Sequence, residues 1–146
     1  MYPPTIAPGF GVQRMSQLLT EKRVHLQDLH SDHQLWLNTL RFCKDEINIF
    51  EKRMEDLARR GPDREVMAEL EHFQNQYIRE REVIDELRHD IKQHENHLEK
   101  FALEHPVAVD HVLFKDHHEL RDKLATFEKL YHELKLEFMR WLADRR

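Results

Sequence analysis

The sequence is poor in the residues that build loops and covalent cross-links. Its 146 residues include three Gly, five Pro and one Cys, and its only serines are Ser16 and Ser31. A single cysteine forms neither an intrachain disulfide nor a cysteine-based zinc site, which fits a reducing compartment, so we expect a cytoplasmic protein. Clustered glycines after a strand and a Gly-x-Ser-x-Gly turn are both missing, which excludes a phosphate-binding loop and an α/β-hydrolase nucleophile.

Long apolar runs and basic stretches are also missing. No segment approaches the roughly eighteen apolar residues of a membrane helix, and residues 1–15 lack the basic start and apolar core of a signal peptide. The net charge is −5, and residues 61–105 carry the deficit, with six Lys and Arg against twelve Asp and Glu. Because there is no basic stripe to follow a phosphate backbone, we expect neither nucleic-acid nor membrane binding.

Long stretches of good helix formers lie between a few helix breakers. Three Pro and two Gly fall within residues 1–11, and the remaining breakers are Gly61, Pro62 and Pro106. The intervals are dominated by Leu, Glu, Lys, Arg, His and Gln, which favour helices over strands. We predict a flexible Pro/Gly leader over residues 1–14 and helices over about 16–60, 62–104 and 111–144.

Apolar residues recur at alternating spacings of three and four in each predicted helix, the heptad pattern of helices that pack side by side. Short connections between long helices make neighbours antiparallel. We therefore predict an all-α protein, an elongated antiparallel three-helix bundle (up-down-up, with coiled-coil-like heptad packing) over residues 15–146. The heptad positions are Leu26, Leu29, His33, Trp36, Leu40, Cys43, Ile47, Phe50, Met54 and Leu57; Val66, Leu70, Phe73, Tyr77, Glu80, Ile84, Leu87, Ile91, His94, Leu98 and Phe101; and Leu113, His117, Leu120, Leu124, Phe127, Tyr131, Leu134, Phe138 and Trp141.

The twelve histidines suggest a response to pH or to metal. With ordinary pKa values near 6.5 they add roughly nine charges at pH 6, so the net charge changes sign between pH 7 and pH 6. The pairs Glu69-x-x-His72 and Glu86-x-x-His89 match the motif of ferritin-like di-iron bundles. Both pairs lie off the heptad seam of one predicted helix, and a fourth helix is missing, so we do not assign that family.

Three histidines, His33, His94 and His117, occupy heptad positions, which raises the hypothesis of a trihistidine zinc-type site. If the first turn is centred near residue 61, His33 faces residues 89 and 90, and His94 lies five residues further on, roughly 7.5 Å along the axis. His94 and His117 meet only if the second connection is short. Register therefore argues against one trihistidine centre and favours three buried polar residues that fix helix order.

The metal ligands that this register favours are His30, His33, His89 and Asp90. They flank the groove between the first two predicted helices at matching height. Neutral imidazole and carboxylate suit zinc or a similar divalent ion. The alternative is that no cofactor binds and His33 hydrogen-bonds a neighbour such as Tyr131, because an unpaired buried imidazole is costly.

Glu80 is the other polar heptad residue, and it is expected in one layer with Cys43. A carboxylate beside a thiol suggests a general base, but no oxyanion donors accompany it and a narrow helical core leaves little room for a substrate. We therefore expect no enzyme, and we expect Glu80 to reach the surface or to accept a hydrogen bond, for example from the Trp141 indole.

The functional prediction is a non-enzymatic interaction or scaffolding element that docks a helical protein partner or a second copy. Near its start the first predicted helix overhangs the second, so Leu18 and Leu19 find little cover within the chain. A histidine-based metal-binding or pH-responsive protein is the alternative, and a small enzyme using Glu80 and Cys43 is the third hypothesis.

Overall fold

The described part of the chain is helical almost throughout. The computed structural model describes residues 10–105 and 111–145, and for residues 10, 18–24, 111 and 112 it describes the backbone only. Its helices are α1 (Phe10–Arg59), α2 (Arg64–Glu104) and α3 (His111–Ala143). No strand occurs among these residues, which confirms the all-α class for them. None of these helices contains a stretch long and apolar enough to cross a membrane.

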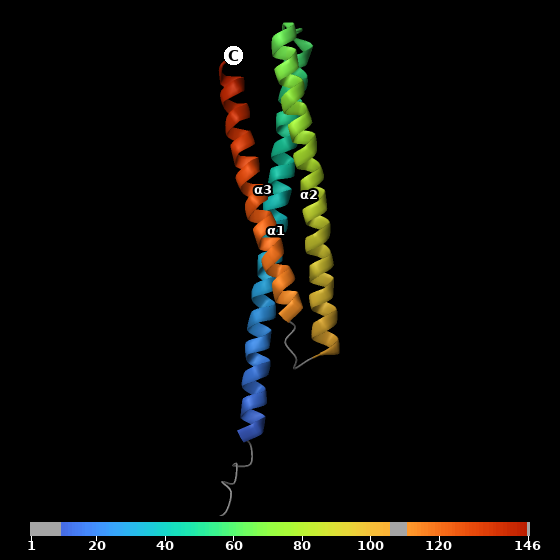
Figure 1. The fold of residues 1–146 in the computed structure, drawn as a ribbon, viewed down its shortest axis with the longest axis vertical. Coiled ribbons are helices and arrows are strands. Elements are labelled where there is room, and N and C mark those ends of the chain that lie inside the picture. Colours follow the sequence, from blue (N-terminus) through green and yellow to red (C-terminus); the bar gives the residue numbers. More distant parts are fainter. Residues whose placement is uncertain (1–9, 106–110, 146) are drawn as a thin grey trace, which may run out of the picture.

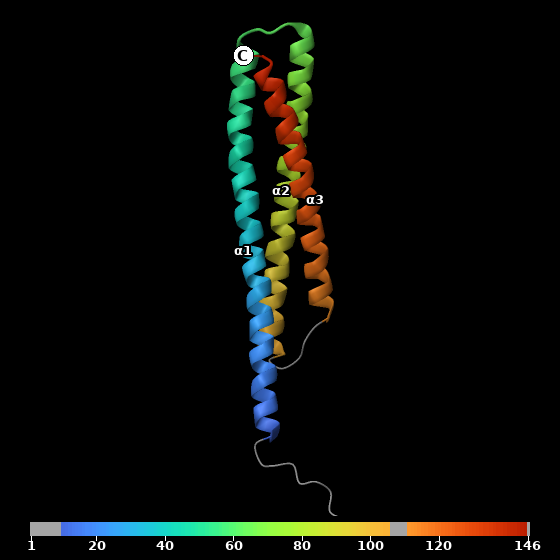
Figure 2. The same cartoon turned by 90° about the vertical axis from the view of Figure 1, so that its left-hand side faces the viewer.

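The helices lie side by side and give the molecule an elongated shape (Figures 1 and 2). From its start at the lower end, α1 runs upward, α2 returns beside it, and α3 runs upward again. In both views the first part of α1 continues below the ends of α2 and α3. This arrangement allows one face of each helix to be buried against the other two.

The turn between α1 and α2 is built by a glycine and an aspartate. Gly61 has a φ of +62°, the left-handed region that glycine adopts without strain and that commonly ends a helix. The side chain of Asp63 accepts a hydrogen bond of 2.9 Å from the backbone N–H of Val66 and so caps α2. Helix α2 therefore begins at Arg64, two residues later than expected, because Asp63 is the cap and Pro62 precedes it.

The first helix starts earlier than the sequence pattern suggested. It begins at Phe10, whereas a leader was expected to extend to residue 14. Pro8 is the last proline before Pro62, and a single glycine such as Gly11 costs a helix only about 1 kcal/mol, so nothing after residue 9 forbids helix. Side chains 11–17 are all exposed.

The second helix ends where the sequence predicts. Its last residue is Glu104, and the backbone N–H of His105 donates a 2.8 Å hydrogen bond to the carbonyl of Phe101. Pro106 follows, and a residue before proline is disfavoured in the helical conformation.

Every fully buried side chain among the described residues occupies a predicted heptad position, so the predicted core face of each helix is confirmed. Apart from Leu120, the buried hydrophobic residues among those described form two clusters. The main core contains Leu40, Cys43, Ile47, Phe50, Met54, Leu70, Phe73, Tyr77, Ile84, Leu87, Ile91, Leu124, Phe127, Tyr131, Leu134, Phe138 and Trp141. The end cluster contains Leu29, Leu98 and Leu113, with Leu26, Phe101 and Phe114 partly buried against them.

Candidate metal centre

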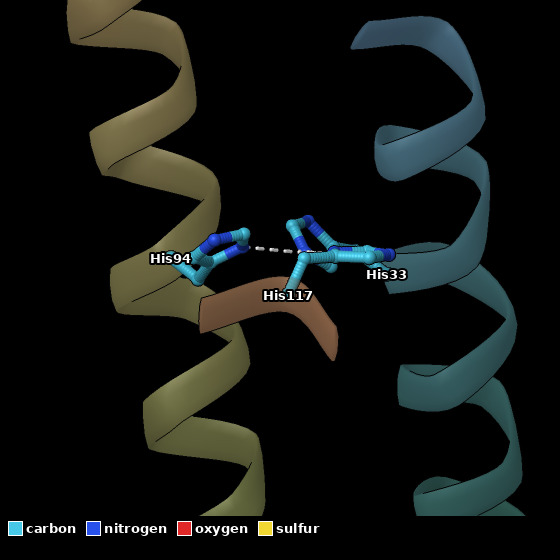
Figure 3. Close-up of side chains that lie close together, drawn as sticks. All are labelled: His33, His94 and His117. Atoms are coloured by element: carbon cyan, nitrogen blue, oxygen red, sulfur yellow. Dashed lines mark hydrogen bonds between the residues drawn. The ribbon is translucent and has the colours of Figure 1, made fainter. Parts of the chain in front are cut away.

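Between the main core and the end cluster, each helix contributes one histidine to a single buried layer. His33 of α1, His94 of α2 and His117 of α3 are 1%, 4% and 2% exposed. Their rings converge on one point (Figure 3), and the three ring centroids lie 5.0 to 5.5 Å apart. The layer joins all of the described helices at one height.

The nitrogen atoms inside this layer have the spacing of a metal-ligand set. His33 Nε2 lies 3.0 Å from His94 Nδ1 and 3.2 Å from His117 Nδ1. One nitrogen from each ring lies within 4.8 Å of the other two. Nitrogens bound tetrahedrally to zinc at about 2.0–2.1 Å are separated from one another by about 3.3 Å. Closing such a site therefore needs shifts of about an ångström in the ring positions.

The outer nitrogen of each ring is held by a group that can only accept a hydrogen bond. His33 Nδ1 contacts the Glu95 carboxylate, and His117 Nε2 lies 2.9 Å from a carboxylate oxygen of Asp32. His94 Nε2 lies 2.9 Å from a backbone carbonyl, that of Leu113. Because these partners accept only, the single N–H of each neutral imidazole points outward. The three inner nitrogens are then unprotonated and present their lone pairs to one another.

The two carboxylates behind the triad are themselves held. Glu95 also contacts Nδ1 of His30, and Asp32 accepts a 2.7 Å hydrogen bond from Arg121. Burial acts to raise the pKa of both carboxyls. Hydrogen bonds from His33 and His30 outweigh burial at Glu95 and lower its pKa below the ordinary value. Hydrogen bonds from His117 and Arg121 do the same for the pKa of Asp32. Ionised carboxylates that orient metal-bound imidazoles are a common outer shell of zinc sites.

Burial also favours the metal-binding, neutral form of two of the imidazoles, those of His94 and His117. It lowers the pKa of His94 and of His117, against the opposing effects of the Leu113 carbonyl on one and Asp32 on the other. Trp36 covers one side of the layer, since its ring stacks on His117 at 4.8 Å between centroids. Neutral imidazole is the ligand form, so at neutral pH the layer offers metal two ready donors in His94 and His117.

The sequence-predicted ligand set is only partly brought together. His30 and His33 converge, but on Glu95 of α2. His89 is exposed, and Asp90 lines a groove of about 240 Å³ between α2 and α3, together with His94. The hypothesis that His33 bonds to Tyr131 is wrong, because the Tyr131 hydroxyl donates to Glu46 at 2.6 Å.

The reason is an error in the assumed register. His33 faces His94, five residues beyond the position expected from a turn centred at residue 61. Helical side chains lean towards the N-terminus of their own helix. On α1 this lean points away from the turn, and on α2 it points towards the turn. The residue of α2 that faces a given residue of α1 therefore lies further along α2 than counting residues from the turn predicts. The helix ends at Arg59 and Arg64 also move the centre of the turn forward.

In the other polar pair of the predicted core, Cys43 and Glu80, the thiol is held in its protonated form. Cys43 is 6% exposed, and burial, followed by the nearby carboxylates of Glu46 and Glu128, raises its pKa to about 11. Burial also raises the pKa of Glu80. The Trp141 indole donates to Glu69 at 2.5 Å, so the suggested hydrogen bond from Trp141 to Glu80 is wrong.

Comparison with known proteins adds no functional information. No protein family, no curated protein and no solved structure matches this chain significantly.

Proposed function

We propose that the chain binds one divalent transition metal ion, with zinc as the representative case, through His33, His94 and His117. The observation that supports this best is the orientation of the three rings. Each outer nitrogen faces an acceptor, so the inner nitrogens, 3.0 and 3.2 Å apart, have no proton between them in the neutral form. A cation at the centre replaces this repulsion between lone pairs by three favourable bonds.

Charge supports the same proposal. Three neutral imidazoles leave a divalent ion uncompensated, and a buried net charge is costly. Glu95 and Asp32 lie directly behind two of the imidazoles and carry the two negative charges that balance the ion. Imidazole also suits copper, nickel and iron, and the donor set alone does not select among these metals.

A proton is the competing occupant of the centre. One proton shared between two of the rings forms a single hydrogen bond between their inner nitrogens. The inner nitrogen of the third ring then faces an N–H that already donates to another ring. A metal satisfies all three nitrogens at once. The two occupants differ in a measurable way, because only the metal has a saturable affinity at constant pH.

Calorimetric titration of the full-length chain with zinc chloride tests the proposal. We expect one zinc per chain, and a loss of affinity of about 100-fold or more when His94 is replaced by Ala, since two imidazoles hold zinc poorly. His89→Ala is the matched control, because His89 is exposed on the same helix and belongs to the ligand set favoured by the sequence.

Folding must be controlled in parallel. The triple variant His33→Leu, His94→Leu, His117→Leu replaces the polar layer by apolar side chains of similar volume, which helical cores tolerate. It should retain the helical circular dichroism of the wild type and bind no zinc. Equal zinc affinity in the wild type, His94→Ala and the triple variant would show that surface histidines account for the binding.

For the architecture of the whole chain, we propose the elongated up-down-up bundle with coiled-coil-like packing predicted from the heptads. The alternating direction of α1, α2 and α3 and the burial of the heptad positions support it. The lone buried thiol of Cys43 fits a reducing, cytoplasmic compartment.

A second candidate function, an interaction element, is supported by the start of α1. This part of α1 extends past α2 and α3 in both views, and Val12 and Met15 are 73% and 53% exposed (Figures 1 and 2). The side chains of Leu18 and Leu19 lie outside the described residues. We propose that a helical partner or a second copy packs here. If so, the full chain and a chain lacking residues 1–20 differ in oligomeric state, measured from the molar mass in solution, or in the partner proteins they retain. If both chains are monomers and retain the same proteins, this candidate is removed.

A further inference from the structure

The histidine layer interrupts the hydrophobic core near one end of the packed helices. On one side lies the main core, which continues to the turn at Gly61. On the other side, the residues that the structure describes form the end cluster, whose fully buried members are three leucines. The segments beyond the layer are residues 25–32 of α1, 95–104 of α2 and 113–116 of α3, which we call the end segment.

Among the described side chains, those of the end segment have little apolar burial. Leu29, Leu98 and Leu113 are buried, whereas Phe101 and Phe114 are only partly covered. Each ordered residue loses backbone conformational entropy, and three buried leucines offset that loss for only a few residues. Regions with few buried apolar contacts open locally well before the whole protein unfolds.

The polar contacts that attach the end segment depend on the histidine layer. His94 Nε2 donates to the carbonyl of Leu113, which holds the first turns of α3 against α2. His33 contacts Glu95, and His117 contacts Asp32, which link α1 to α2 and to α3. Each of these contacts uses the outer nitrogen of one ring of the layer, and the facing lone pairs of the neutral rings oppose keeping the three rings together.

We propose that metal binding at the histidine layer controls whether the end segment is packed. With metal bound, the three rings are joined and the end segment adopts the closed arrangement described above. Without metal, the layer separates and the apolar faces of Leu98, Phe101 and Leu113 become accessible. The chain is then a metal-dependent conformational switch; this inference rests on the proposed metal binding.

Hydrogen–deuterium exchange of the full-length chain, with and without zinc, tests the inference. In zinc-free protein, amides of residues 95–104 and 113–116 should exchange close to the rate of an unstructured peptide, while amides of residues 47–54 and 70–77 in the main core stay protected. At free zinc about 100 times the dissociation constant, exchange in the end segment should slow by about 100-fold, because opening must release the ion.

The triple leucine variant is the matched control. Apolar side chains in the layer join the main core to the end cluster, so its end segment should be protected without zinc and unchanged by zinc. Calorimetry on the same samples separates the two proposals. Absence of zinc binding overturns both. Zinc binding with an end segment that is already protected in zinc-free protein, or that stays unprotected when zinc is bound, overturns the switch and leaves the metal site intact.

Discussion

His33 Nε2 lies 3.0 Å from Nδ1 of His94, although the outer nitrogen of each ring already faces an acceptor. Two neutral imidazoles in this arrangement have no proton to share. This contact is the main support for the proposal that the layer binds a cation.

Glu95 should strengthen metal binding without touching the metal. It contacts the outer nitrogen of His33 and carries negative charge, and loss of such an outer partner weakens metal sites by about 10-fold to 100-fold. Glu95→Gln should lower zinc affinity in that range, measured by competition with a chromogenic chelator. Glu99→Gln, an exposed carboxyl one turn along α2, is the control and should leave the affinity unchanged. Unchanged affinity in Glu95→Gln would show that Glu95 plays no part in the site.

The zinc-loaded protein, in which all three rings are buried, should lose stability as the pH falls from 7.5 to 5.5. Burial lowers the pKa of His94 and His117 below the unfolded value of about 6.5. Around and below pH 6.5 the unfolded chain therefore binds more protons than the folded chain, and the free energy of unfolding decreases with pH. Asp32 acts to raise the pKa of His117, and Asp116 acts to raise that of His94. His33 acts with burial to lower both pKa values.

Urea unfolding at the two pH values measures this loss. His94→Leu should lose less stability than the wild type over the same interval, because one of the shifted groups is gone. His132→Leu, at an exposed position of α3, should behave as the wild type does. A loss in His94→Leu as large as that of the wild type would exclude His94 as a source of the pH dependence.

Two buried tyrosines should respond in opposite ways to loss of the hydroxyl. The Tyr77 hydroxyl is buried, and no described residue offers it a hydrogen bond, so Tyr77→Phe should raise the free energy of unfolding by about 1 kcal/mol. The Tyr131 hydroxyl donates to Glu46, so Tyr131→Phe should lower it by about 1–2 kcal/mol. Chemical denaturation measures both. Destabilisation by Tyr77→Phe would mean that its hydroxyl has a partner in solution.

The Cys43 thiol should be inert in the folded protein. With its pKa raised to about 11, about one thiol in a thousand is ionised at pH 8, and burial blocks access to it. Reaction with Ellman's reagent at pH 8 should be slower by about 100-fold or more in native buffer than in urea. Rapid stoichiometric reaction of the native protein would contradict the described burial.

The sequence predicted the helices and their core faces because both depend on local information. Heptad spacing identified every buried position among the residues whose burial is described, and Pro106 located the end of α2 to within a residue. The cap at Asp63 shifted one boundary by two residues, and the absence of a breaker after Pro8 shifted another. These differences are the size expected when a single side chain decides where a helix starts.

The candidate metal centre was harder to predict, because it depends on the axial offset between helices. His33, His94 and His117 were recognised as polar core residues, but an offset error of five residues separated them. Side-chain lean and the geometry of a four-residue turn set that offset, and neither follows from heptad pattern alone. Glu95 and Asp32 were missed for the same reason, although each is adjacent in sequence to a heptad histidine.

Anomalous X-ray diffraction from crystals of the zinc-loaded full-length chain, collected at the zinc absorption edge, tests the central claim most directly. We predict one strong anomalous peak in the buried layer, about 2.0–2.1 Å from Nε2 of His33 and from Nδ1 of His94 and His117. Peaks confined to exposed histidines such as His89, with the buried layer empty at saturating zinc, would contradict it.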